Sequence, residues 1–147
     1  MESKTLSFDI EPGMADGEKV VFEREAEQHP DVIPGDVVFI LKQKPNKRFK
    51  RVLNNLYTEM EVTLQEALLG FRKKLVHLDG RTIEVRSPEG EIIEPFSWMT
   101  IAGEGMPLHN TPSEKGDLLI KFKVKLPGKL NSAQRNLLEE IFKESKN

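Results

Sequence analysis

One segment near the C-terminus constrains the fold most, because its side chains alternate between apolar and basic. The apolar positions are Leu118, Ile120, Phe122, Val124 and Leu126. The basic positions are Lys121, Lys123 and Lys125. A period of two is typical of a strand that buries one face. The lysines favour a solvated strand edge over a binding patch, because lysine on an edge also opposes pairing with another chain.

Other apolar runs of strand length recur along the chain, separated by Pro-Gly and Asp-Gly turns. We expect strands over 5–10, 20–22, 37–41, 56–62, 71–78, 81–86 and 98–102. The run 37–41 is continuously apolar, which predicts a strand covered on both faces, or covered on one face and open as an apolar groove on the other. Together these segments predict a mostly β protein.

Two helices are expected among the strands. Thr63 and Glu66 have the spacing of a capping box, and Gly70 can end this short helix in a left-handed conformation. Asn131 or Ser132 can cap a second helix that runs to about residue 144. The apolar stripe of this second helix is Ala133, Leu137, Leu138, Ile141 and Phe142. A helix of this length is marginal alone, so the stripe packs either on its own sheet or on a second copy of the chain.

The segment 34–42 recurs in shape at 115–123, which predicts two copies of one small β-rich unit, the first truncated at its N-terminal side. Composition excludes several kinds of site. The 147 residues contain no cysteine, and three scattered histidines share no ligand spacing, so no metal site is expected. No run approaches the ~20 apolar residues of a membrane span. No nucleophile with a base and no phosphate-binding loop is evident, so we expect no enzyme.

Residues 42–51 hold six basic side chains, although the net charge of the chain is −2. A nucleic-acid patch looks like this locally, but the overall charge argues against nucleic acid as a partner. A better hypothesis is a docking surface for an acidic tail of a partner chaperone, formed by Lys47, Arg48 and Lys50.

Six ordered segments resemble the tandem C-terminal domains of the DnaJ co-chaperone family, class A in particular. They are residues 10–17 (IEPGMADG), 30–39 (PDVIPGDVVF), 66–71 (EALLGF), 78–80 (LDG), 103–107 (GEGMP) and 115–120 (KGDLLI). Single pieces such as LDG are weak, but the ordered set covers nearly all of residues 5–144. The resemblance implies two tandem small β-sandwich-like domains, a short helix and a C-terminal dimerisation helix.

The domain bounds expected from the resemblance are 1–46 for the remainder of a client-binding domain, 47–128 for a second domain, and 129–147 for the helix. The first domain would bind extended apolar segments of unfolded clients and present them to a 70-kDa heat-shock chaperone. Leu6 and Phe39 match two client-pocket positions, although ordinary core packing is the alternative for both. Leu137, Leu138, Ile141 and Phe142 would form the contact of a homodimer.

The family's J domain and cysteine-rich zinc module are not represented in this sequence, so no cofactor is expected here and zinc is expected in the upstream module. The tripeptide His29-Pro30-Asp31 looks like the J-domain signature but stands between predicted strands, and we interpret it as a coincidence. The motifs favour the endoplasmic-reticulum lumen, with the cytoplasm as the alternative. The alternative function is a β-sandwich interaction module with one fixed folded partner.

Overall fold

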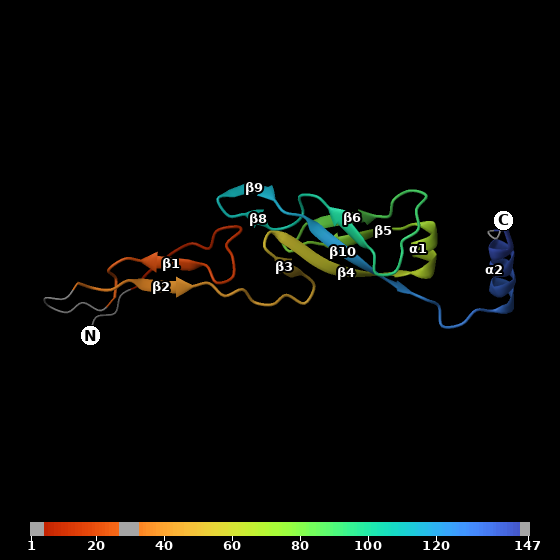
Figure 1. Ribbon diagram of the computed structural model, residues 1–147, viewed down its shortest axis with the longest axis horizontal. Coiled ribbons are helices and arrows are strands. Elements are labelled where there is room, and N and C mark those ends of the chain that lie inside the picture. The colour runs from red at the N-terminus through yellow and green to blue at the C-terminus, as the bar shows by residue number, and fades with distance from the viewer. Residues whose placement is uncertain (1–4, 27–32, 145–147) are drawn as a thin grey trace. The chain divides into compact units, whose positions relative to one another are not determined.

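The computed structural model describes residues 5–26 and 33–144 (Figure 1). The tripeptide at 29–31 and the start of the 30–39 motif therefore lie outside the described residues. The elements in chain order are β1 (Lys19–Phe22), β2 (Val37–Ile40), β3 (Lys50–Val52), β4 (Asn55–Thr63), α1 (Leu64–Leu69), β5 (Arg72–Val76), β6 (Thr82–Arg86), β7 (Trp98–Ile101), β8 (Pro107–Leu108), β9 (Thr111–Lys115), β10 (Leu118–Lys125) and α2 (Ser132–Glu144). The predicted mostly β fold, with one short helix and one C-terminal helix, is confirmed.

The chain divides into two compact units. The first unit comprises Met1–Thr58 and Trp98–Ile120, and the second comprises Glu59–Ser97 and Lys121–Asn147. The boundary between them falls within strands β4 and β10. This division does not test the expected domain bounds of 1–46, 47–128 and 129–147, which stay a prediction.

Strands pair into four sheets. The largest has the order β3-β4-β10-β7, and the strand pairs β1-β2, β5-β6 and β8-β9 form the others. The predicted alternation is confirmed over β10, since Leu118, Ile120 and Phe122 are each 0% exposed while Lys123 and Lys125 are exposed. It does not extend to Leu126, which follows the strand and is 68% exposed. The sheet therefore buries the face that the sequence marks as apolar.

The turn between β3 and β4 fits closely against two glycines within the first unit. The carbonyl oxygen of Asn54 accepts a hydrogen bond of 2.7 Å from the amide of Met106. A Cβ atom on Gly116 would lie 2.1 Å from that oxygen, and one on Gly105 would lie 2.4 Å from it. The glycines of the 103–107 and 115–120 motifs are thus required for the close approach of two backbones.

The second unit contains α1 and the hairpin β5-β6. The predicted capping box is confirmed, because the Thr63 Oγ1 accepts from the Glu66 amide at 3.2 Å and the Thr63 amide donates to Glu66 Oε1 at 2.9 Å. The bond from the Thr63 amide lowers the pKa of Glu66, and Lys73 adds to this effect. Gly70 ends the helix with φ 99° and ψ 161°, which lies outside the left-handed helical region that we expected.

One predicted strand is wrong, and three short strands were not predicted. The strand predicted over 5–10 is wrong: these residues form no ladder, although Leu6 and Phe8 are half-buried between exposed neighbours. The alternation of side chains is present, but a strand also needs a partner backbone, and 5–10 has none among the described strands. Strands β3, β8 and β9 were missed because β3 and β9 are largely polar and β8 has only two residues. Pairing with a neighbouring strand defines them, not an apolar period.

The close fit at Gly116 gives a test. We expect Gly116→Ala to lower the free energy of unfolding by about 1–3 kcal/mol, because the added methyl group would overlap the Asn54 carbonyl. Urea unfolding followed by circular dichroism measures this. Gly128→Ala is the matched control, since an added Cβ there meets nothing within 4 Å. Equal stability of the two variants would contradict the packing described.

Candidate interaction surfaces

The strand pair β1-β2 carries apolar side chains on both of its faces. Its antiparallel register places Val20 opposite Phe39 and Phe22 opposite Val37, so these four side chains share one face. The other face carries Val21 opposite Val38 and Lys19 opposite Ile40. On that second face Val38 and Val21 are exposed, and Ile40 is 64% exposed. Of the two alternatives predicted for residues 37–41, a strand covered on both faces is therefore wrong for the single chain. The alternative of a strand with one open apolar face agrees with these exposures.

Three aromatic rings gather on the first face of the strand pair. The ring centroids of Phe8 and Phe39 are 5.3 Å apart, those of Phe22 and Phe39 are 5.6 Å apart, and those of Phe8 and Phe22 are 6.0 Å apart. Phe39 and Phe22 meet edge to face, the geometry that the charge distribution of aromatic rings favours. We call Phe8, Phe22 and Phe39 the aromatic cluster.

The two predicted pocket residues, Leu6 and Phe39, differ in their surroundings. Phe39 belongs to the aromatic cluster and stays 37% exposed. Leu6 is half-buried two residues before Phe8. Phe8 and Phe22 also belong to this surface and were not predicted from the sequence. The period of two that links Leu6 to Phe8 could have predicted that Phe8 lies on the same face as Leu6. Phe22 reaches this face through its pairing with Val37, which the sequence does not show.

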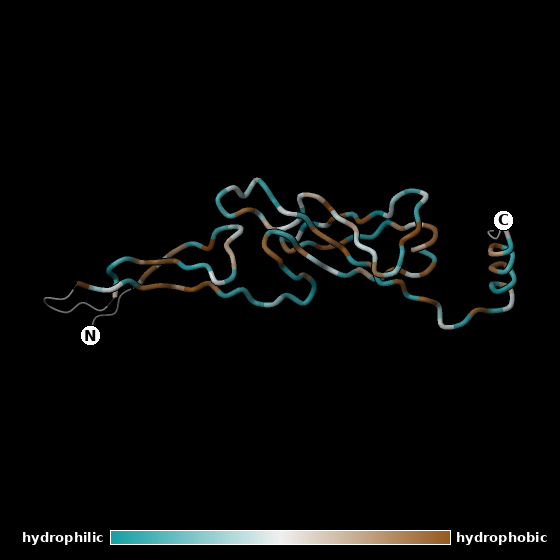
Figure 2. The backbone as a smooth tube through the Cα atoms, in the orientation of Figure 1, coloured by the Kyte–Doolittle hydropathy of each residue, from teal (hydrophilic) through white to brown (hydrophobic). Residues whose placement is uncertain are grey.

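Within residues 5–26 and 33–144, the outer backbone edges of the strand pair carry no further strand. Since β1-β2 is a two-stranded sheet, each strand uses one row of N–H and C=O groups for its partner and leaves the other row outside the ladder. Figure 2 colours β2 as hydrophobic along its length. An exposed apolar strand with an open edge is a ready template for an added strand.

The helix α2 begins after Asn131, whose Oδ1 accepts a hydrogen bond of 2.8 Å from the amide of Gln134, so Asn131 is the cap. The predicted dimerisation residues are largely uncovered in the single chain. Leu137 is 66% exposed, Ile141 and Phe142 are also exposed, and Leu138 is half-buried. Figure 2 shows the apolar residues of α2 along one side of the helix.

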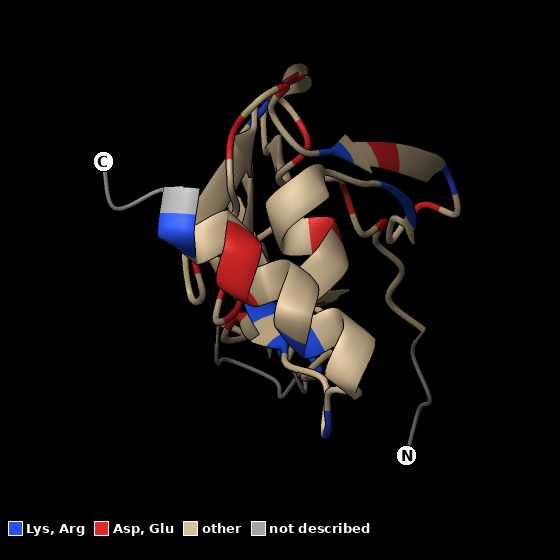
Figure 3. Cartoon of the chain, turned by 90° about the vertical axis from the view of Figure 1, so that its right-hand side faces the viewer, with Lys and Arg blue, Asp and Glu red and all other residues tan. Residues whose placement is uncertain are grey.

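The predicted docking residues Lys47, Arg48 and Lys50 are all exposed. The Arg48 guanidinium lies 5.2 Å from the ring centroid of Phe49, and that ring is buried. A buried ring cannot stack on a base, which removes the aromatic component of the nucleic-acid interpretation. Figure 3 marks the basic residues in blue and the acidic residues in red.

The lysines of β10 are engaged with neighbouring side chains. Lys123 Nζ lies 2.9 Å from Glu59 Oε2, and this hydrogen-bonded ion pair lowers the pKa of Glu59 and raises the pKa of Lys123. Lys121 Nζ lies 5.5 Å from the ring centroid of Phe96. The predicted strand edge is wrong, because β10 is paired with β4 on one side and with β7 on the other. The lysines belong to a central strand, and their contacts with Glu59 and Phe96 do not indicate a surface prepared for an anionic partner.

Neither a metal centre nor a membrane span is evident in the described part of the chain. Within residues 5–26 and 33–144, no group of three or more His, Cys, Asp or Glu side chains is arranged to hold a metal ion. No helix in the same ranges is long and apolar enough to cross a bilayer.

The described chain is a β-rich protein with an exposed apolar strand pair and an exposed apolar helix stripe. Residues 1–127 match the family described as DnaJ C terminal domain. The chain therefore belongs to the DnaJ C-terminal domain family, as its motifs predicted.

Curated relatives agree with this assignment. Chaperone protein dnaJ 3 of Arabidopsis thaliana is 41% identical over 140 residues, which are 95% of this chain and 33% of the relative. DnaJ protein homolog ANJ1 of Atriplex nummularia is 43% identical over 140 residues, which are 95% of this chain and 34% of the relative. DnaJ homolog subfamily A member 2 of Homo sapiens is 44% identical over 126 residues, 86% of this chain and 31% of the relative. The predicted similarity to class A DnaJ chaperones is confirmed, and the chain spans about a third of the length of these relatives.

Proposed function

We propose that this chain captures extended apolar segments of unfolded polypeptides along the strand pair β1-β2. The observation that carries the proposal is the combination of open strand edges with the exposed apolar residues Val38, Phe39 and Ile40. A client segment adds to an edge as a further strand through backbone hydrogen bonds, which makes capture tolerant of client sequence. Its apolar side chains pack near Leu6 and the aromatic cluster.

Capture of this kind is weak and reversible. Burial of one leucine-sized client side chain contributes roughly 1.5–3 kcal/mol, and the ordering of an unfolded segment opposes binding. A client held this loosely is released easily, which suits a co-chaperone that passes clients to a 70-kDa heat-shock chaperone. The proposal includes no catalytic step and no cofactor for this chain.

The client site is tested by truncating one ring of the aromatic cluster. We expect Phe39→Ala to weaken binding of an unfolded, leucine-rich peptide by about tenfold, because the client loses an apolar contact surface. Fluorescence anisotropy with a labelled peptide measures the affinity. Phe96→Ala is the matched control, since Phe96 is also an exposed phenylalanine but lies in the second unit.

A comparison of clients separates this function from the alternative of an interaction module with one fixed folded partner. The full chain is expected to slow the aggregation of several unrelated denatured proteins, followed by light scattering. Suppression of none of them, or equal peptide affinities for Phe39→Ala and Phe96→Ala, would favour the fixed-partner module.

We also propose that two copies of the chain pair through α2. Leu137, Ile141 and Phe142 are exposed in the single chain, and an apolar helix stripe left in water is unfavourable. A symmetric contact would bury the same stripe from both copies. Pairing would also bring two client-binding strand pairs into one particle, which raises the avidity for long clients.

The homodimer is tested by placing a charge in the stripe. Ile141→Glu or Leu138→Glu is expected to give monomers in sedimentation velocity, because an unpaired carboxylate would be buried at the contact. Asn136→Glu introduces the same charge at an exposed position of α2 outside the stripe and is expected to leave the dimer intact. A wild-type chain that sediments as a monomer at high concentration would contradict the dimer.

Lys47, Arg48 and Lys50 are proposed to dock an acidic tail of the partner chaperone. Their exposure supports the proposal, because three basic side chains close together in the sequence attract a short run of carboxylates. We propose the endoplasmic-reticulum lumen as the compartment of this protein, with the cytoplasm as the alternative.

The docking residues are tested with an acidic peptide. Replacing Lys47, Arg48 and Lys50 by Ala is expected to abolish a binding that weakens as salt is raised, measured by calorimetry at two ionic strengths. The control replaces the exposed Arg72, Lys74 and Arg86 by Ala and changes the charge equally. Equal losses in both variants would show a general charge effect and would contradict a docking surface.

A further inference from the structure

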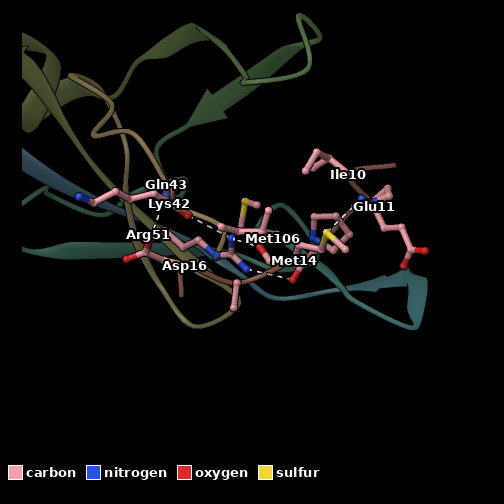
Figure 4. Close-up of a pocket in the computed structure, with 13 residues that line it drawn as sticks. Ile10, Glu11, Met14, Asp16, Lys42, Gln43, Arg51 and Met106 are labelled. Atoms are coloured by element: carbon pink, nitrogen blue, oxygen red, sulfur yellow. Dashed lines mark hydrogen bonds between the residues drawn. The ribbon is translucent and has the colours of Figure 1, made fainter. Parts of the chain in front are cut away.

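Arg51 stands in the wall of an open cleft of about 460 Å³ in the first unit. The cleft is lined by residues 10–16, 41–43, 51, 106 and 107. Figure 4 shows the Arg51 side chain extended between Gln43 and Met14, with dashed hydrogen bonds to both. The proposed client-binding and docking surfaces do not use Arg51.

The guanidinium of Arg51 joins segments that are far apart in the sequence. Nη1 donates to the carbonyl oxygen of Met14 at 2.7 Å, and Nη2 donates to that of Gly13 at 3.2 Å. Nε donates to the carbonyl oxygen of Leu53 at 2.8 Å, and Nη1 also donates to Gln43 Oε1 at 3.1 Å. One side chain on β3 therefore binds three main-chain carbonyls and one side-chain amide.

These bonds fall at the end of the β1-β2 ladder. Beyond the pair Lys19 and Ile40, the ladder continues because the Leu41 amide donates to the Glu18 carbonyl and the Gly17 amide donates to the Leu41 carbonyl, each at 2.8 Å. The Gln43 amide then donates to Asp16 Oδ1 at 2.7 Å. Arg51 binds Gln43 on one side of this last contact and Met14 and Gly13, which precede Asp16, on the other side.

The same connection is held from a second direction by the hairpin β8-β9. A Cβ atom on Gly13 would lie 2.4 Å from the Pro107 carbonyl oxygen and 2.5 Å from the His109 amide nitrogen. The ring of His109 also contacts Glu11, with Nε2 2.7 Å from Oε2. Residues 11–14 are thus fixed between β3 and the β8-β9 hairpin, and the backbone at Gly13 has no room to shift toward the hairpin.

We infer that Arg51 is a positioning residue, which fixes the end of the β1-β2 ladder on the β3-β4 turn and so sets the position of the strand pair within the first unit. Arginine suits this role because its planar group presents five donors in a fixed fork. Lysine keeps the charge but carries all its donors on one nitrogen, so it cannot serve carbonyls on two separate segments in the same way.

One consequence rests on the proposed client-binding function. A strand edge that is held in place loses little further freedom when a client strand adds to it, so an ordered ladder end strengthens capture. Loss of the Arg51 hydrogen bonds at the end of the β1-β2 ladder is therefore expected to weaken the affinity for a client peptide, even though every residue of the aromatic cluster is retained.

Amide hydrogen exchange of the full chain, followed by NMR, tests the positioning role without any client. In Arg51→Lys, the amides of Gly17, Leu41 and Gln43 are expected to exchange about tenfold faster or more, because hydrogen bonds to a charged donor are lost. The amides of His77 and Ser87, bonded within the second unit, should keep their rates. Arg72→Lys is the matched control, since Arg72 makes one exposed contact with Glu84.

Three outcomes decide the inference. Faster exchange confined to the ladder end in Arg51→Lys, with no change in Arg72→Lys, supports it. Unchanged rates at Gly17, Leu41 and Gln43 overturn it. Equal acceleration in both units also overturns it, because Arg51 would then stabilise the fold as a whole. Local acceleration with an unchanged affinity for the labelled peptide would keep Arg51 as a positioning residue and count against the strand pair as the client site.

Discussion

A β-strand has two rows of backbone hydrogen-bonding groups, and in the pair β1-β2 each strand uses only one of them for its described partner. This constraint governs what the surface can do. A protein partner can bond along this open backbone row and pack on the exposed valine, isoleucine and phenylalanine side chains if it presents an extended chain. A folded globular surface offers few such chains, whereas an unfolded polypeptide offers many.

An open strand edge can accept a further strand only if the contacts that hold the strand pair keep it in position. Within the first unit that support consists of close backbone contacts, which Gly13, Gly105 and Gly116 permit because they carry no side chain. Arg51 adds directional bonds to the same region. Rigid contacts therefore surround the end of the strand pair, while the apolar part of the pair stays exposed. This division fits a protein that must retain its shape and still accept varied partners.

Much of the fold could be predicted from local patterns. The alternation at 118–125, the capping box at Thr63 and Glu66, and the helix after Asn131 each depend on neighbours in sequence, and each appears in the structure. Residues 5–10 show the limit of this approach, because an alternating segment without a partner backbone forms no strand. Strands β3, β8 and β9 show the converse, since pairing defines them without an apolar period.

The functional surface was predictable only in part. Phe39 stood out through the resemblance, and the apolar stripe of α2 stood out through its helical period. The roles of Phe22 and Arg51 depend on residues that are distant in the sequence, such as Phe39 for the first and Gly13 for the second. The glycine motifs at 103–107 and 115–120 could be recognised by their resemblance to the family. Why glycine is needed there became clear only from the position of the Asn54 carbonyl oxygen beside Gly105 and Gly116.

The central claim is that unfolded chain pairs with the backbone of β1 or β2. Hydrogen exchange with and without an excess of an unfolded client measures this directly. The account predicts slower exchange of the amides in Lys19–Phe22 or Val37–Ile40 when the client is bound, with the β5-β6 amides unchanged. Protection confined to β5-β6, or none within the strand pair at a saturating client concentration, would contradict it.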